Sequence, residues 1–346
     1  MATPDLTVHG AGIFGLSVAW AAAQRGAKVR VIEAVRVGAG SSGGIVGALA
    51  PHTPDNWNPK KAFQLKSLLM AESWWAQVTA AGGLSPGYAR TGRLQAVADD
   101  VALALAQQRT TSADKLWQGR AIWELARAGQ SKWEPATPTG WLIHDTLSAR
   151  IHPRRALEAL VAALQAKGCE IILGEAAAYG PQIWATGAAG LQTLSESHSR
   201  LVGTAVKGQA ALLQFDAALL PQIFTEGLHV IAHADGTVAI GSTSERDWTI
   251  ADSTDAKLEA LIAHARLALP ILADAPVLDR WAGLRPRSRN RSPMLGSWPD
   301  RPGHFIANGG FKIGFGMAPN IAETMIDLVF DGTDAVPKGF RVEDNF

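Results

Sequence analysis

The feature that most constrains this 346-residue chain is a glycine-spaced segment near its start, GAGIFG at residues 10–15. A short β-favouring run, Leu6 to His9, precedes it, and an Ala-rich helical run from Leu16 to Gln24 follows. A second apolar strand, Lys28 to Glu33, completes the unit. A glycine segment between a strand and a helix, with an acid about 20 residues further on, is typical of dinucleotide-binding folds.

Each residue of this signature has a predicted task. Gly10 permits the tight turn, Gly12 lets the backbone approach a pyrophosphate, and Gly15 allows the helix to pack closely on the strand. The unpaired N–H groups and the dipole at the start of the helix favour a bound anion. Glu33 ends the second strand, where its carboxylate can accept hydrogen bonds from the ribose hydroxyls.

A second glycine-rich segment, GAGSSGGIVG at residues 38–47, favours FAD over NAD. It offers hydroxyl groups and bare backbone shortly after the ribose acid. This suits an elongated cofactor that continues past its pyrophosphate toward a flavin. The alternative, a flexible surface loop, stays open at this point.

Composition excludes several other classes of protein. With 47% hydrophobic and 18% charged residues the chain is globular, and its length predicts two domains. A net charge of +1 gives no support for nucleic-acid binding, which depends on neutralising phosphates. The single cysteine, Cys169, cannot form an internal disulfide or a Cys-rich metal site. No apolar run approaches the roughly 20 residues of a membrane span, so we expect a cytoplasmic protein.

Nucleotide-type elements occur at the start, middle and end of the chain, so the domains are expected to interleave. We predict an α/β protein in which a Rossmann-type FAD-binding domain is interleaved with an α+β substrate domain built on an antiparallel sheet. The FAD-binding domain is predicted at residues 1–75, 145–210 and 280–346, and the substrate domain at 76–144 and 211–279. Further predictions are a helix over 63–78, a Pro- and Arg-rich segment at 281–291, and a C-terminal helix over about 320–330.

Seven motifs then appear in an order that resembles the D-amino acid oxidase (DAO) superfamily of FAD enzymes, most of all its glycine oxidase and sarcosine oxidase-like branch. The motifs are VHGAGIFG (8–15) with Glu33, SSGGIVGA (41–48), WATGA (184–188), KGQ (207–209), VAIGSTSE (238–245), WAGLRP (281–286) and NGGFKIGFGMAP (308–319). The resemblance implies noncovalent FAD and transfer of a hydride to the flavin from a carbon that bears an amine. The imine product hydrolyses to an oxo acid or aldehyde, and oxygen reoxidises the flavin, which gives hydrogen peroxide. The implied partners are a small amine or amino acid and oxygen, without a membrane or a nucleic acid.

The resemblance also assigns FAD-binding residues from these motifs. They are Gly10, Gly12, Ile13, Phe14, Gly15, Glu33, Ala34, Ser41, Ser42, Gly43, Gly44, Ile45, Thr186, Gly187, Arg285, Gly309, Gly310, Phe311, Lys312, Ile313 and Gly314. No cysteine matches a position of covalent flavin attachment, because Cys169 lies in a helix-to-strand connection.

Three catalytic candidates follow from the same resemblance. Arg285 lies where the branch places the arginine that pairs with the substrate carboxylate, since a guanidinium fork matches a carboxylate in two parallel hydrogen bonds. Lys312 is placed to stabilise the anionic reduced flavin, and His229 stands where glycine oxidases have a tyrosine. Ile45 and Ser244 line the substrate pocket with Arg285, and Ser244 replaces a larger apolar residue. These departures put glycine specificity in doubt.

Two further patterns have competing interpretations. Arg287, Arg289 and Arg291 alternate with Ser and Asn, which is typical of a solvated face; the alternative is a basic strip for a larger anionic substrate. His229 and His233 lie roughly 13 Å apart if both are on one strand, too far for one ion, so we expect no metal site.

Two alternative functions remain open. The segments GALAP (47–51) and RNRSPMLG (289–296) are similar to the FAD domain that trims carboxymethylaminomethyl groups on tRNA wobble uridine. The near-neutral charge and the lack of a fused methyltransferase argue against that function. A flavin dehydrogenase that does not react with oxygen is the other alternative.

Overall fold

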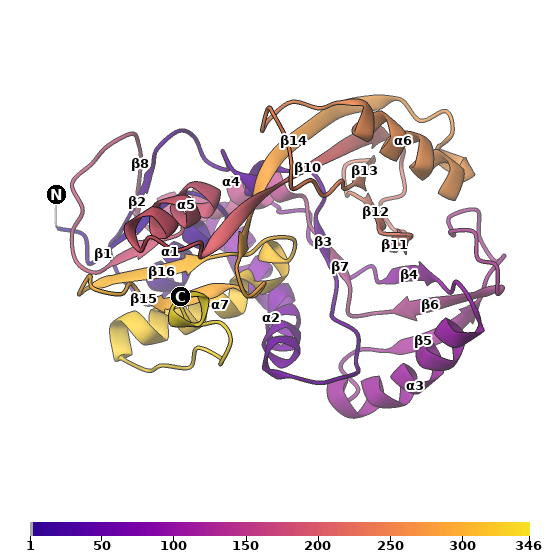
Figure 1. The fold of residues 1–346 in the computed structure, drawn as a ribbon, viewed down its shortest axis with the longest axis horizontal. Helices are drawn as coiled ribbons and strands as arrows, with labels where there is room; N and C mark the ends of the chain where they lie inside the picture. Colours follow the sequence, from indigo (N-terminus) through magenta and orange to yellow (C-terminus); the bar gives the residue numbers. More distant parts are fainter. Residues whose placement is uncertain (1–2) are drawn as a thin grey trace.

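The computed structural model describes residues 3–346, and two sheets occupy its two halves (Figure 1). The six-stranded sheet has the order β15-β16-β9-β1-β2-β8, and all neighbours are parallel except β15 and β16. This order, with the first strand central, is that of a Rossmann-type half. Its strands are β1 (Leu6–His9), β2 (Val29–Glu33), β8 (Glu170–Leu173), β9 (Gln182–Trp184), β15 (Met294–Ser297) and β16 (His304–Asn308).

The second sheet has eight strands in the order β14-β10-β13-β12-β11-β4-β6-β5 and is antiparallel except between β11 and β4. The predicted mixed α/β fold, with a parallel sheet and a largely antiparallel one, is thereby confirmed. Its strands are β4 (Arg93–Ala96), β5 (Trp123–Arg127), β6 (Trp141–Asp145), β10 (Gly203–Gln214), β11 (Gln222–Thr225), β12 (Leu228–Ala232), β13 (Thr237–Gly241) and β14 (Val277–Ser288); β3 (Ala48–Leu49) pairs with β7 (Ala149–Arg150).

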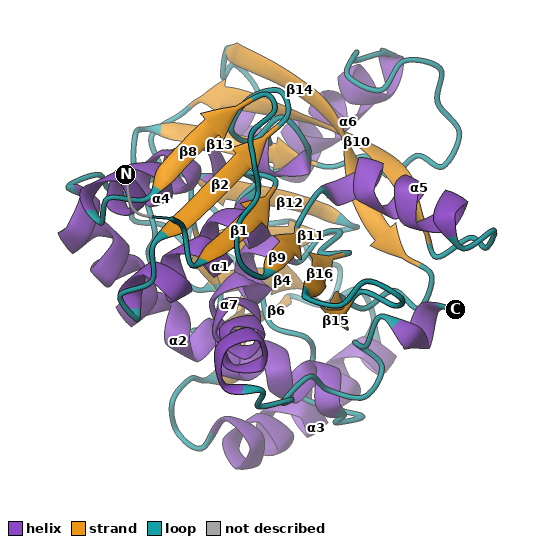
Figure 2. Ribbon diagram, turned by 90° about the vertical axis from the view of Figure 1, so that its left-hand side faces the viewer, coloured by secondary structure: helices purple, strands orange, loops and turns teal. Residues whose placement is uncertain are grey.

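Four helices pack together beside the parallel sheet, and Figure 2 shows α1, α2 and α7 below its strands. Helix α1 is apolar on every side and buried along nearly its whole length, as expected of a helix enclosed by a sheet and other helices. The helices are α1 (Ile13–Gln24), α2 (Pro59–Gly82), α4 (Pro153–Ala166) and α7 (Gly314–Asp331) beside this sheet, and α3 (Asp100–Trp117), α5 (Gly187–Ser197) and α6 (Ala256–Ala268) elsewhere; η1 (Ser41–Gly43), η2 (Pro270–Leu272) and η3 (Glu343–Asn345) are single 3₁₀ turns.

Two predicted helices are longer in the structure. Helix α2 begins four residues before the predicted start, because Asn58 caps it with its side chain and Pro59 takes its first position. Helix α7 begins at Gly314 rather than near Asn320 and includes Pro319. Sequence rules place a proline at a helix start, but burial of this segment against its neighbours favours the helix in spite of one missing hydrogen bond.

The Pro- and Arg-rich segment at residues 281–291, for which the sequence predicts no particular element, lies mostly in β14, which continues as a strand to Ser288. Strand β14 pairs with β10 from Gly203 to Leu213, and these long strands cross from one half of the molecule to the other (Figure 1). Strand β10 runs unbroken through residue 210, so the division into residue ranges stays a prediction.

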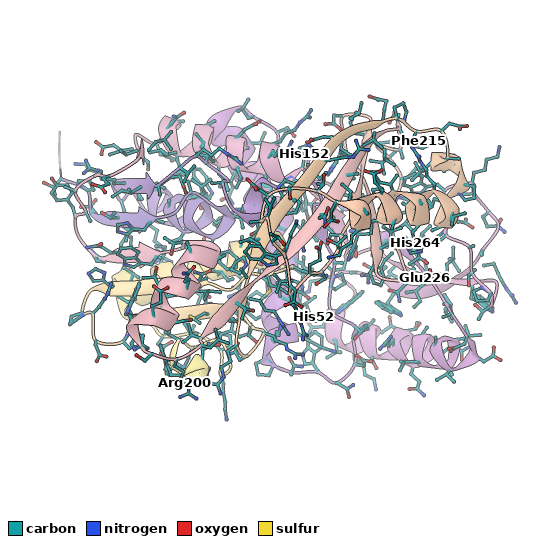
Figure 3. All side chains as sticks on the ribbon, turned by 45° about the horizontal axis from the view of Figure 1, so that its top comes forward. His52, His152, Arg200, Phe215, Glu226 and His264 are labelled. Carbon is teal, nitrogen blue, oxygen red and sulfur yellow. The ribbon has the colours of Figure 1, made fainter. Side chains whose placement is uncertain are left out.

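One face of the eight-stranded sheet is a hydrophobic core under α6, with Leu258 and Ile262 packed on Val230, Val238 and Ile240. His264 on α6 bonds to Glu226 in the turn after β11 (Figure 3). The opposite face, called the polar face below, carries Arg93, Gln222, His229, Gly208 and Arg285. The segment after η1 approaches this face, since Gly44 lies near Trp281 and Val46 near Gly241.

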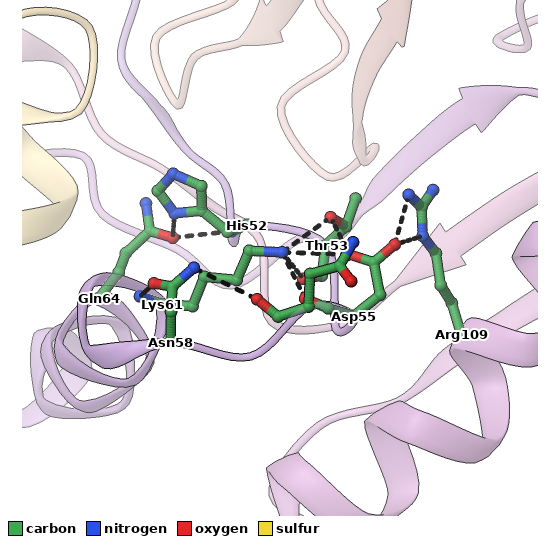
Figure 4. A network of polar contacts seen from close by, with 8 residues as sticks. His52, Thr53, Asp55, Asn58, Lys61, Gln64 and Arg109 are labelled. Atoms are coloured by element: carbon green, nitrogen blue, oxygen red, sulfur yellow. Dashed lines mark hydrogen bonds and ion pairs between the residues drawn. The ribbon is translucent and has the colours of Figure 1, made fainter. Parts of the chain in front are cut away.

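A polar network fixes the segment between β3 and α2 (Figure 4). Asp55 accepts hydrogen bonds from Lys61 at the start of α2 and from Arg109 on α3 at 2.8 Å, so it joins helices of both halves. His52 bonds to Gln64 on α2. In the described residues, every helix is too short or too polar to cross a membrane.

Candidate functional site

The turn between β1 and α1 leaves no room for side chains. Gly10 has a φ of +103°, and a Cβ added there would lie 2.6 Å from the carbonyl oxygen of Ala185. A Cβ on Gly15 would lie 1.9 Å from the carbonyl oxygen of Gly10. Both positions therefore require glycine, and the turn leads directly into the N-terminus of α1, a place where anions are favoured.

Two side chains fix this turn from neighbouring segments. The Glu33 carboxylate, at the end of β2, accepts hydrogen bonds from the backbone N–H of Ala11 at 2.7 Å and of Val35 at 3.0 Å. The Ser42 hydroxyl accepts one from the N–H of Ile13 at 3.0 Å. A Cβ on Gly12 would lie 3.1 Å from that hydroxyl oxygen. The acid, the hydroxyl and the bare turn thus lie together, as a dinucleotide requires.

The other predicted cofactor residues converge on the same place from distant parts of the chain. A Cβ on Gly310 would lie 2.8 Å from the ring of Phe14, and one on Gly314 would contact Ile13. The Gly187 carbonyl accepts a hydrogen bond from Asn308 at 2.9 Å, which joins α5 to the loop before α7. The remaining ones lie on these segments: Ala34 after β2, Ser41, Gly43, Gly44 and Ile45 in and after η1, Thr186 before α5, and Gly309, Phe311, Lys312 and Ile313 after β16. The cradle fits the elongated FAD that the sequence predicts.

The polar face of the eight-stranded sheet carries two of the three predicted catalytic residues, Arg285 and His229. Directly opposite residues of antiparallel strands share a face. The register pairs Arg285 with Val206, Gly283 with Gly208, and His229 with Gly241. The pairing of the strands therefore brings Arg285 and His229, which are 56 positions apart, onto one surface. The segment after η1 approaches this surface, where Val46 lies next to Gly241.

Arg285 is 7% exposed and lies across the backbone of Gly208, where an added Cβ would be 1.7 Å from a guanidinium nitrogen. It donates a hydrogen bond to the carbonyl oxygen of Thr243 at 3.1 Å. Within residues 3–346 no carboxylate lies within ion-pair distance of it. Burial lowers the pKa of Arg285 to about 10, although nearby Glu245 raises it. A buried guanidinium with open donors is suited to an incoming carboxylate.

Glu245 supports this cation from the far side of the sheet. Burial raises the pKa of its carboxyl, but hydrogen bonds from Thr243, Gln209 and Lys257 hold it below its usual value. Glu245 therefore stays charged at neutral pH without occupying the donors of Arg285.

His229 and Lys312 lie on the same side of the sheet. Burial lowers the pKa of His229 to about 4, and the cations Arg93 and Lys312 add to the effect. Nδ1 of His229 is buried without a hydrogen-bond partner in the described residues, and its ring lies 4.7 Å from that of Phe224. Burial, and then Arg285, lowers the pKa of Lys312. His229 is thus neutral at pH 7 and keeps one nitrogen for a ligand.

Ile45 and Ser244, predicted to line the pocket, differ in exposure: Ile45 is fully buried and Ser244 is exposed. The Ile45 carbonyl oxygen lies 2.9 Å from Nε2 of His233. The ring of His233 lies 4.6 Å from that of His152, which is itself 4.0 Å from Asp235. This buried histidine pair fixes the backbone beside the cofactor segment.

This arrangement predicts loss of stability in acid. Burial lowers the pKa of His233 to about 4, helped by His152 and Arg150 and opposed by the Ile45 bond and Asp235, against 6.5 when unfolded. The unfolded chain binds more protons between these values, so this contribution is complete above pH 6.5 and falls as pH drops toward 4. We expect His233→Gln to reduce the loss of unfolding free energy between pH 8 and pH 5 by about 2 kcal/mol in urea titrations. Equal losses in both proteins would contradict the role of His233.

Sequence reasoning missed Gly208, Thr243 and His233. Gly208 stands in a quoted motif, yet its task appears only once β10 and β14 are paired and two glycines, Gly208 and Gly283, face each other beneath Arg285. Thr243 acts through its backbone carbonyl, which any residue supplies. His233 was considered only as a metal ligand.

Comparison with known proteins identifies relatives over nearly the whole chain. The family model described as "DAO: FAD dependent oxidoreductase" matches residues 5–328. Glycine oxidase of Pseudomonas putida is 28% identical over 362 aligned positions, covering 94% of each chain. Glycine oxidase of Pseudomonas aeruginosa is 36% identical over 125 residues, 36% of this chain and 34% of that protein. The crystal structure of glycine oxidase from Geobacillus kaustophilus superposes with a TM-score of 0.83 at 19% identity over 98% of both chains.

Proposed function

The chain belongs to the DAO family of FAD-dependent oxidoreductases, and we propose that it oxidises a small amine that carries a carboxylate, with FAD bound noncovalently. The observation that carries the proposal is Arg285, a buried guanidinium that has no carboxylate partner within residues 3–346. Similarity to glycine oxidases supports an amino acid as substrate. Their substrate is not transferred directly, because His229 and Ser244 replace larger residues of that branch.

The proposed division of labour follows from the positions of the residues. Gly10, Gly12, Gly15, Glu33 and Ser42 hold the dinucleotide part, and the segments at residues 41–45 and 309–314 hold the flavin part. The cysteine Cys169 is buried after α4, where its N–H bonds to Leu164, which supports noncovalent attachment. The residue ranges predicted for the two domains are part of the same proposal.

FAD, when bound, supplies the acceptor for a hydride from the carbon that bears the amine. Arg285 binds the substrate carboxylate with two donors and so fixes the position of the adjacent carbon. The cations Arg285 and Lys312 disfavour a protonated amine nearby, because like charges lower the pKa of an ammonium group. His229, neutral because of burial, offers an unpartnered nitrogen to the uncharged amine.

The test mixes the purified yellow protein anaerobically with glycine, sarcosine, both enantiomers of alanine, and amines without a carboxylate. We expect at least one carboxylate-bearing amine to bleach the visible flavin absorption, and carboxylate-free amines to do so far more slowly. A yellow protein that none of them bleaches would contradict the proposal.

Admission of oxygen to the bleached sample separates an oxidase from a dehydrogenase. Return of the yellow colour with one equivalent of hydrogen peroxide is expected for an oxidase. Slow recovery without peroxide would replace it with the oxygen-insensitive alternative. Release of FAD from acid-denatured protein into the supernatant tests the noncovalent attachment.

A further inference from the structure

Arg285 shares its face of the sheet with other arginines, among them Arg93, which is paired with Asp145. Arg287 follows it by two residues on β14, and residues two apart on a strand share a face. Glu245 pairs with Lys207 in an antiparallel bridge, and both line a cavity on the opposite face. Arg246 is the next residue, in the bend after this bridge, and it lies close enough to Arg287 for its charge to lower the pKa of that guanidinium.

The loop after β16 brings a further cation to this group. The N–H of Phe311 donates to the Pro286 carbonyl at 3.0 Å, which ties the loop to β14 between the two arginines. The Arg287 guanidinium and Nζ of Lys312 each lie 5.8 Å from the centre of the Phe311 ring. The Phe311 ring therefore has a cation near it from β14 and another from its own loop, and the charge of Arg285 lowers the pKa of Lys312.

No acidic side chain within residues 3–346 neutralises these cations by a direct ion pair. Within residues 3–346, no carboxylate oxygen lies within 4.0 Å of Arg246, Arg287 or Lys312, whereas Arg93 on the same sheet pairs with Asp145 at 2.9 Å. Burial is the main cause that lowers the pKa of Arg287, and the charges of Arg291 and Arg246 lower it further. These cations therefore repel one another. In a chain of net charge +1, such a cluster of like charges costs free energy that a bound anion recovers.

We propose that Arg246 and Arg287 form a second anion subsite, so that the preferred substrates are amines with two carboxylates, such as amino dicarboxylic acids. The inference rests on the proposed function, because the first carboxylate is taken to bind Arg285. The Cα atoms of Arg285 and Arg287 are roughly 7 Å apart along the strand, comparable to the span of the outer oxygens of a five-carbon dicarboxylate. Arg285 and Arg287 thus select substrates by the distance between their two carboxylates, and this part of β14 is more than a solvated surface.

The direct test measures binding of two unreactive acids of equal length, glutarate and pentanoate, to the FAD-loaded protein by titration calorimetry. We expect glutarate to bind at least about tenfold more tightly at low salt, since hydrogen bonds between charged groups are the strong ones. In the double variant Arg246→Gln/Arg287→Gln, glutarate should bind only as well as pentanoate, whose affinity stays unchanged. Arg301→Gln, an exposed arginine over Trp298, is the control and should leave both affinities as they are.

Two outcomes would overturn the second subsite. One is equal affinity for the two acids in the unmodified protein, and the other is an unchanged ratio in the double variant. A ratio that falls with added sodium chloride supports the subsite without any substitution, because exposed ion pairs are screened. Steady-state kinetics with glutamate and norvaline, both enantiomers of each, should show the same preference for the diacid in kcat/KM.

Failure of the proposed function gives a different pattern. If Arg285→Met leaves pentanoate affinity unchanged, the first carboxylate site is wrong. If Arg285→Met abolishes pentanoate binding but glutarate gains nothing over pentanoate in the unmodified protein, only the second subsite is wrong.

Discussion

Replacing Arg285 with methionine is expected to lower kcat/KM for carboxylate-bearing amines by about a thousandfold. The guanidinium is buried and has no carboxylate partner in the part of the chain that the structure describes, so a substrate carboxylate bound there forms a desolvated pair. Removing one partner of such a pair costs about 4 kcal/mol, which corresponds to a factor of about a thousand. Methionine has similar length and no charge, so the protein should keep its flavin and its unfolding midpoint.

The controls separate substrate binding from general damage. Oxidation of an amine without a carboxylate should change far less, because it never used the guanidinium. Arg289 lies four residues further along the same segment, and its side chain is exposed. The variant Arg289→Met should therefore behave as the unmodified protein. A comparable loss for both substrate classes, or less than a tenfold loss for the carboxylate-bearing one, would contradict the assignment of Arg285.

The N-terminal unit could be predicted because its information is local. The turn at residues 10–15 must be bare, the run after it is a strong helix former, and Glu33 ends the next strand; each of these follows from neighbouring residues. The structure differs by three residues at the start of α1, which begins at Ile13 within the glycine segment. Close packing against β9 and α7 stabilises a helical turn whose glycines have low intrinsic helix propensity.

The long strands could not be predicted in full because their pairing is remote in sequence. Strands β10 and β14 meet over a separation of about 75 residues, and the sequence after Arg285 has no local strand signal, because Pro286 and the alternating arginines follow. In the sheet, Pro286 pairs opposite Ala205 near the end of the ladder. The same register places Arg287 on the face of Arg285, a relation that spacing alone suggests only if the strand is known to continue.

Among the site residues, Arg285 was recognisable from its motif, whereas its support was not. The resemblance of WAGLRP to the family motif points to Arg285 as a carboxylate ligand, but Thr243 contributes only a backbone atom and Gly208 only the lack of a side chain. A glycine in a strand usually suggests a bulge or a weak point. Here it makes room for a side chain from the adjacent strand, and this makes its substitution a direct test of the geometry.

Gly208→Ala is expected to lower kcat/KM by about a hundredfold with little change in stability. The added Cβ would lie 1.7 Å from the nearest guanidinium nitrogen of Arg285 and 2.1 Å from its central carbon, so the side chain must move. The backbone at Gly208 has no positive φ, and the obstacle is the end of a flexible side chain, so the fold can accommodate alanine. A displacement of about 1 Å at a positioning group costs about a factor of a hundred in rate.

The substitution should act only through Arg285, and a double-mutant cycle measures this. With methionine at position 285 no guanidinium remains to be displaced, so Gly208→Ala should add almost nothing to Arg285→Met. Thr204→Ala, exposed on the same strand, is the control for a general effect on β10. If the two losses in kcat/KM multiply in the double variant, Gly208 acts elsewhere. If the double variant loses no more than Arg285→Met alone, the position of one guanidinium accounts for both effects.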